Sequence, residues 1–145
     1  MDEVEILLVE DNAADVELAL RALKKNKIAN KVEVVNDGEE ALNFIYARGQ
    51  YKDRAGARLP KVILLDLKLP KVNGLEVLTE IKSNPKTKMV PVVVLTSSKE
   101  ESDIVESYKL GVNSYIVKPV DFDKFLLSVK EIGMYWLLIN QPSNL

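Results

Sequence analysis

The chain has 145 residues, of which 47% are hydrophobic and 29% charged, as is typical of one folded domain and not of a disordered chain. Twenty basic and 22 acidic side chains give a formal net charge of −2, which argues against a sequence-independent grip on nucleic acid. The absence of Cys and His excludes disulfides, thiolate nucleophiles, imidazole bases and the usual zinc ligands.

Short apolar, β-branched runs alternate along the chain with stretches of helical periodicity. In chain order we expect a strand at 4–9, a helix at 13–25, a strand at 31–35, a helix at 39–47 and a long charged surface loop at 48–60. Beyond this loop we expect a strand at 61–65, a helix at 74–83, a strand at 90–95, a helix at 99–110, a strand at 113–117 and a last helix at 121–139. Asn12 is a candidate N-cap for the first helix, and Gly111 ends the fourth.

These elements alternate regularly, and no internal repeat or linker divides the chain. Strands that are apolar throughout are typical of a parallel sheet covered on both faces. We therefore predict an α/β, flavodoxin-like doubly wound fold with five parallel strands in the order 2-1-3-4-5 and five helices. The domain would span residues 1–138, with a short tail at 139–145 and no output domain. The acidic start, MDEVE, is unlike a signal peptide, and no apolar run is long enough to span a membrane, so a cytoplasmic location is expected.

Polar side chains follow the strands at the points where the strands end. Ligands of such sheets bind beyond the carboxyl ends, at the switch point, which here lies between strands one and three. The residues expected there are Glu10 and Asp11 after strand one, Asp66 after strand three, Thr96 after strand four and Lys118 after strand five. Each has a purely structural alternative, since acids serve as turn and cap residues, threonine suits a strand and lysine suits a solvated loop.

Taken together, these groups are the ones that phosphoryl transfer requires. Clustered carboxylates repel one another, and a divalent cation relieves the repulsion. Mg²⁺ prefers one or two carboxylates together with phosphate oxygens and waters, and a nearby lysine supplies a second positive charge. Because phosphoryl transfer depends on positioning and charge neutralisation, and a carboxylate can act as the nucleophile, the pattern predicts an aspartyl phosphate formed at this edge of the sheet.

Five motifs occur in the order and at the spacing found in response-regulator receiver domains of two-component signalling, which the chain resembles over about residues 4–138. They are LLVEDN (7–12), NDGEEAL (36–42), ILLDLKLPKVNGLEVL (63–78), PVVVLTSS (91–98) and GVNSYIVKP (111–119). The long loop and the segment SYKLGVNSYIVKPVD are similar to single-domain regulators that partner phytochrome-type histidine kinases. The resemblance implies a phosphoacceptor switch that catalyses only its own phosphorylation and dephosphorylation, driven by a sensor histidine kinase.

The resemblance also implies a role for each residue at the strand ends. Asp66 would accept the phosphoryl group. Asp11 and Asp66 would bind Mg²⁺ directly, with the backbone carbonyl of Lys68 as a third ligand and Glu10 acting directly or through water. Lys118 would pair with the phosphoryl oxygens. Thr96 would hydrogen-bond the phosphoryl group, and Tyr115 would swing inward behind it as the second part of the switch.

Some features near the site qualify this assignment. Glu10 stands where Asp is commonest in the family, and its extra methylene shifts the carboxylate. In the family, the side chains at the positions of Lys68 and Ser98 flank the path of an attacking water, so the resemblance implies that these two residues influence the lifetime of the phosphate. Ser97 is small, which would let the phosphoryl group approach the backbone. The family has a cis peptide bond at the position of Lys118-Pro119.

Output would pass through contact with a downstream protein or a phosphotransfer domain, without nucleic acid or membrane. The last helix carries MYWLLI (134–139), a surplus of apolar residues that suits either the core or a homodimer interface. Sedimentation at micromolar concentration tests that dimer hypothesis. Two rival functions remain: a haloacid-dehalogenase-like phosphohydrolase, which would need a second Asp where Lys68 stands, and a receiver-like binding module that never takes phosphate.

Overall fold

The computed structural model describes residues 4–25, 31–118, 121 and 123. One parallel sheet in the order β2-β1-β3-β4-β5, as predicted, is formed by β1 (Ile6–Val9), β2 (Val32–Val35), β3 (Val62–Leu65), β4 (Val92–Thr96) and β5 (Ser114–Val117). The helices are α1 (Ala13–Lys25), α2 (Gly38–Ile45), α3 (Gly74–Ser83) and α4 (Glu101–Lys109). The predicted fifth helix, the apolar segment 134–139 and the peptide bond to Pro119 lie outside the described residues.

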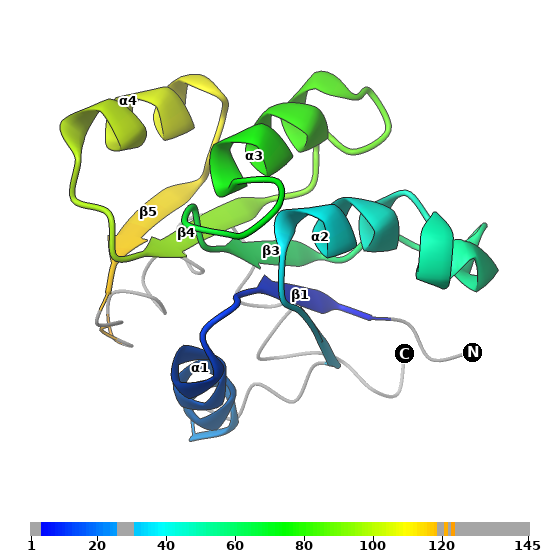
Figure 1. Ribbon diagram of the computed structural model, residues 1–145, viewed down its shortest axis with the longest axis horizontal. Coiled ribbons are helices and arrows are strands. Elements are labelled where there is room, and N and C mark those ends of the chain that lie inside the picture. The colour runs from blue at the N-terminus through cyan, green and yellow to red at the C-terminus, as the bar shows by residue number, and fades with distance from the viewer. Residues whose placement is uncertain (1–3, 26–30, 119–120, 122, 124–145) are drawn as a thin grey trace, which may run out of the picture.

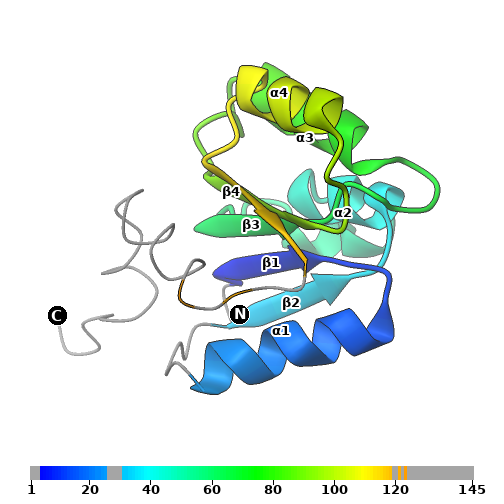
Figure 2. The same cartoon turned by 90° about the vertical axis from the view of Figure 1, so that its left-hand side faces the viewer.

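Helices cover the sheet on both faces, with α1 on one side and α2, α3 and α4 on the other (Figures 1 and 2). Successive strand residues point to opposite faces, so β1 divides its side chains between two cores. Leu7 and Val9 pack into the core beneath α2 and α3, whereas Ile6 and Leu8 pack into the core beneath α1. All four side chains are buried, which explains why the strand is apolar throughout. Within the part of the chain that the structure describes, no helix is both long and apolar enough to cross a membrane.

The ends of the elements are set by caps and by proline. Asn12, Asp37 and Asn73 each accept a hydrogen bond from a backbone N–H three residues on, which makes them N-caps of α1, α2 and α3. The cap at Asn12 confirms the prediction. The fourth strand runs over Val92–Thr96 and not over 90–95, because Pro91 has no N–H to donate to a ladder. Thr96 is thus the last residue of β4, paired with Val117, and does not follow the strand.

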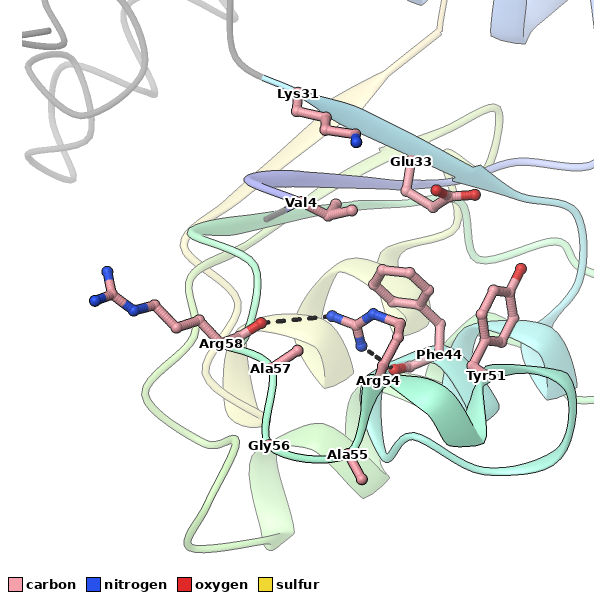
Figure 3. A pocket seen from close by; sticks show the side chains of 10 residues that line it. All are labelled: Val4, Lys31, Glu33, Phe44, Tyr51, Arg54, Ala55, Gly56, Ala57 and Arg58. Atoms are coloured by element: carbon pink, nitrogen blue, oxygen red, sulfur yellow. Dashed lines mark hydrogen bonds between the residues drawn. The ribbon is translucent and has the colours of Figure 1, made fainter. Parts of the chain in front are cut away.

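The segment 48–60 is more ordered than the predicted surface loop, since it contains a 3-10 helix, η1 (Gly49–Arg54). The ring of Tyr51 meets that of Phe44 edge-on, with centroids 5.1 Å apart, and the Arg54 guanidinium lies 3.6 Å from the centroid of the Phe44 ring. Arg54 also donates hydrogen bonds to the carbonyls of Phe44 and Arg58 (Figure 3). The composition suggested a solvated loop, but these contacts with α2 depend on tertiary partners and leave no local pattern.

Candidate functional site

The three carboxylates predicted at the switch point lie together. Glu10 and Asp11 follow β1, Asp66 follows β3, and the two strands are neighbours with Val9 opposite Leu65. One oxygen from each carboxylate lies within 4.8 Å of the other two. Glu10 and Asp66 are 3% and 5% exposed, whereas Asp11 is exposed. Two of the three charges are therefore held where water solvates them poorly, and they require compensation by hydrogen bonds or cations.

Backbone donors satisfy one oxygen of each buried acid. The Asn12 N–H donates to Glu10 Oε2 at 3.2 Å, and the Lys68 N–H donates to Asp66 Oδ1 at 3.0 Å. The loop beyond β3 is itself held against α3, because the Gly74 N–H donates to the Leu67 carbonyl at 2.8 Å. These bonds set the orientation of both carboxylates by the course of the main chain. The same loop turns the Lys68 side chain to solvent.

Lys118 reaches the cluster from the end of β5. Its Nζ lies 2.6 Å from Glu10 Oε1, 2.8 Å from Asp15 Oδ2 and 3.0 Å from Asp66 Oδ2. Its side chain is 14% exposed, so these pairs are largely shielded from solvent. The predicted convergence of the amine on the two switch-point acids is therefore present, and a third carboxylate joins it.

Burial shifts the protonation of this group. Desolvation raises the pKa of Glu10 from 4.5 to about 7, with a further contribution from the charge of Asp66, while the hydrogen bonds from Lys118 and the Asn12 N–H oppose the shift. Burial by itself would lower the pKa of Lys118, but its hydrogen bonds to Asp15, Glu10 and Asp66 outweigh that effect and raise it above the ordinary value. Lys118 therefore stays a cation at neutral pH, whereas Glu10 gains or loses its proton at a pH near 7.

We expect the affinity of the carboxylate cluster for Mg²⁺ to rise with pH up to about 7, since Glu10 must lose its proton to act as a ligand. The expected rise is about tenfold per pH unit below that pKa. The sign for stability is opposite: between 4.5 and about 7 the folded chain binds a proton that the unfolded chain does not, so the unfolding free energy contributed by Glu10 falls as pH rises. Calorimetric Mg²⁺ titrations on either side of pH 7 measure the first effect. Glu10→Gln should weaken binding and flatten its pH dependence, and equal wild-type affinities at both pH values would contradict the assignment.

The predicted switch residues, Thr96 and Tyr115, lie in the neighbouring strands β4 and β5. Thr96 is fully buried, and its Oγ1 accepts a hydrogen bond from the Ser98 N–H at 3.3 Å. The Tyr115 hydroxyl donates to the Ser98 carbonyl at 3.0 Å, which places its ring against the loop after β4. Ser97, the residue between Thr96 and Ser98, is exposed. The structure thus joins Thr96 and Tyr115 through the backbone of one intervening loop residue.

Two acids at the site have no counterpart in the sequence prediction. Asp15 contacts Lys118, and its place in the first turn of α1, three residues after the Asn12 N-cap, is the signal that could have placed it near this edge of the sheet. Asp103 on α4 accepts a hydrogen bond from the Ser98 hydroxyl at 2.6 Å. Asp103, Asp11 and Lys68 line one cavity of about 480 Å³ beside the carboxylates. The hydrogen bond to Asp103 therefore ties the Ser98 hydroxyl to α4.

The donor set suits a hard divalent cation. Three carboxylates within 4.8 Å of one another offer only oxygen, and two of them are buried and close enough to repel each other. The sole cation bonded to both buried acids is Lys118, among the residues that the structure describes. A metal bound to Glu10, Asp11 and Asp66 would relieve the same repulsion that Lys118 now offsets.

Comparison with known proteins gives the same picture. The family model for the response regulator receiver domain matches residues 6–130. The response regulator Rcp1 of Synechocystis is 43% identical over 132 residues, which cover 91% of this chain and 88% of Rcp1. A probable methanogenesis regulatory protein, FilR2 of Methanothrix harundinacea, is 42% identical and covered to 83%, with 91% of this chain aligned.

Solved structures extend the likeness to the whole fold. The bacteriophytochrome response regulator RtBRR is 50% identical, with a TM-score of 0.85 over 99% of this chain and 86% of the other. The phosphorylated cyanobacterial phytochrome response regulator RcpA is 46% identical, with a TM-score of 0.76 over 94% of this chain and 95% of RcpA. The Mn²⁺-bound form of Rcp1 has a TM-score of 0.77 at 40% identity, covering 98% of each chain.

Proposed function

The chain belongs to the family of response regulator receiver domains, a signalling switch of two-component systems, and on this premise we propose that Asp66 is its phosphoacceptor. The supporting observation is the setting of the Asp66 carboxylate, buried beside Glu10 and Asp11 with Lys118 Nζ 3.0 Å from one oxygen. In the transfer, an Asp66 oxygen forms a bond to phosphorus while the bond from phosphorus to the phosphohistidine nitrogen of a sensor kinase breaks. The electron pair of that broken bond stays on the imidazole.

The residues of the site divide the work of charge neutralisation and positioning. Mg²⁺ held by Glu10, Asp11, Asp66 and the Lys68 carbonyl would neutralise charge on the transferred group. The Lys118 ammonium, already 3.0 Å from Asp66, supplies the second positive charge. The backbone N–H of Lys68 holds the other Asp66 oxygen in place. Receiver domains bind divalent metal, and Mg²⁺ in particular is our proposal for this chain.

The switch that follows is proposed to run through Thr96 and Tyr115. The Thr96 hydroxyl now accepts a hydrogen bond from the Ser98 N–H. If Asp66 carried a phosphoryl group, the same hydroxyl could donate a hydrogen bond to a phosphoryl oxygen. Movement of Thr96 toward the phosphate would also displace the loop after β4, to which Tyr115 is hydrogen-bonded. The loop and the N-terminus of α4 would then change together, because Ser98 is also bonded to Asp103.

Membership in this family implies a histidine kinase partner. A phytochrome-type kinase is our proposal, supported by the likeness to RtBRR, RcpA and Rcp1. Signalling by contact with a downstream protein or by phosphorelay, and a homodimer through the last helix, stay predictions from the sequence. A cytoplasmic location is likewise a prediction from the sequence.

The deciding experiment is incubation with acetyl phosphate and Mg²⁺, followed by intact mass and phosphate release. We expect a transient gain of one phosphoryl group in the wild type and none in Asp66→Asn. Asp53→Asn, an exposed acid in η1, is the matched control and should behave as the wild type. Rapid turnover of unrelated phosphate esters would instead favour the phosphohydrolase, and no adduct under any condition would favour the binding module.

A further inference from the structure

The ammonium of Lys118 lies among three carboxylates that have different relations to phosphoryl transfer. Glu10 and Asp66 belong to the cluster that suits a metal, at 2.6 and 3.0 Å from Nζ. Asp15, at 2.8 Å, contributes no oxygen to that cluster and comes from the first turn of α1. Of the four side chains, Asp15 therefore interacts with Lys118 and does not belong to the carboxylate cluster.

The position of Asp15 is set by its own helix. Its backbone N–H donates to the Asn12 side chain at 3.0 Å, in the cap that starts α1. An acid in the first turn of a helix also interacts favourably with the helix dipole. Its side chain is 35% exposed, against 4% for Glu10 and 6% for Asp66, so Asp15 lies at the solvent edge of the group around Lys118. Asp15 is thus held in place by its own helix, at the edge of the site.

The other two partners of Lys118 would not hold it in the same way throughout the proposed reaction. Oxygens of Glu10 and Asp66 that bound a metal would be less available to the ammonium, and one Asp66 oxygen would become bonded to phosphorus. Asp15 would undergo neither change. We propose that Asp15 is a positioning residue that keeps the Lys118 ammonium beside Asp66 while the phosphoryl group arrives. This inference rests on the proposed function and adds to it a carboxylate that orients the essential lysine.

Asp15 could instead hinder the transfer, and loss of its charge would then change the phosphorylation rate in the opposite direction. If the acid mainly withdrew Lys118 from the phosphoryl group, removal of its charge would speed the transfer. The structure favours positioning, because Nζ contacts Asp15 and Asp66 at the same time and is not drawn from one to the other. The direction of the rate change separates these roles.

The test compares Asp15→Asn, Asp15→Glu and Glu17→Gln for the rate of phosphorylation by acetyl phosphate with Mg²⁺. We expect Asp15→Asn to slow the reaction by about tenfold, as is usual when the partner that orients a functional group is lost. Asp15→Glu should restore part of the rate, since it keeps the charge on a longer stem. Glu17→Gln, which removes an exposed acid of the same helix paired with Arg21, should leave the rate unchanged.

A double-mutant cycle shows whether the effect acts through the lysine. In a Lys118→Met background, followed over long incubations, Asp15→Asn should cause no further loss. A second readout uses the unphosphorylated protein: the ammonium protons of Lys118, observed by nuclear magnetic resonance, should exchange faster with water in Asp15→Asn. An unchanged or higher rate in Asp15→Asn, or an equal loss in both backgrounds, would overturn the inference. If the wild type formed no adduct on Asp66, the proposed function itself would fail and the inference with it, which is a distinct result.

Discussion

Lys118→Met is expected to slow phosphorylation of Asp66 by about 10²- to 10³-fold, because it removes a preorganised positive charge from the place where charge is transferred. It should also lower the unfolding free energy at neutral pH. Without the ammonium, the buried carboxyl groups of Glu10 and Asp66 lose the cation that they share, and Glu10 keeps its proton at neutral pH to avoid repelling Asp66, at a total cost of about 3 kcal/mol. Phosphorylation kinetics by mass and urea unfolding in the absence of metal measure the two effects separately.

The matched control for this variant is Lys82→Met. Lys82 is another partly buried lysine, whose Nζ donates to the carbonyls of Lys88 and Val90; it lies in the last turn of α3, whereas the first residue of that helix contacts the loop after β3. It has no carboxylate partner in these bonds, so its replacement should leave phosphorylation unchanged. Addition of Mg²⁺ should recover part of the stability lost in Lys118→Met, since the metal offsets the same repulsion. A Lys118→Met protein that is phosphorylated at the wild-type rate would refute the role of the lysine.

Gly74→Ala is expected to destabilise the protein by about 3 kcal/mol and to disturb the phosphoacceptor, because no space exists for the added methyl group. A Cβ at Gly74 would lie 2.3 Å from the Leu67 Cα and 2.5 Å from the Asp66 carbonyl oxygen. Both contacts are with backbone, which cannot rotate away as a side chain can. The loop after β3 must therefore shift, and Asp66 and the Lys68 carbonyl shift with it. The unfolding free energy measured in urea and the affinity for Mg²⁺ should both fall.

Gly56→Ala separates the steric effect at Gly74 from the backbone strain that alanine causes at a glycine with positive φ. Gly56 has φ of +87°, but a Cβ there meets no atom within 4 Å. Its replacement should cost about 1 kcal/mol from the left-handed backbone alone, and Mg²⁺ affinity should stay unchanged. Equal effects of Gly74→Ala and Gly56→Ala would mean that the contact between α3 and the loop does not set the site.

The fold was predictable because its determinants are local and periodic. Apolar runs mark the strands, helical spacing marks the helices between them, and right-handed crossovers leave few orders for five parallel strands. The prediction differed from the structure at element ends, where particular contacts decide. Pro91 delays the start of β4, and η1 forms within the predicted loop because Tyr51 and Arg54 pack on Phe44. Such contacts join residues of different elements and leave no periodic signal.

The sequence by itself determined that Glu10, Asp11, Asp66 and Lys118 meet, since each follows a parallel strand and the carboxyl ends of such strands share one edge of the sheet. Only the tertiary structure decided which groups hold the ammonium, because Asp15 reaches Lys118 from a helix face and not from a strand end. It likewise decided the partner of Ser98, because the bond to Asp103 depends on how α4 packs beside α3 and β5. Topology places residues to within an element, whereas the hydrogen bonds of a site depend on distances of a few tenths of an ångström that side-chain packing sets.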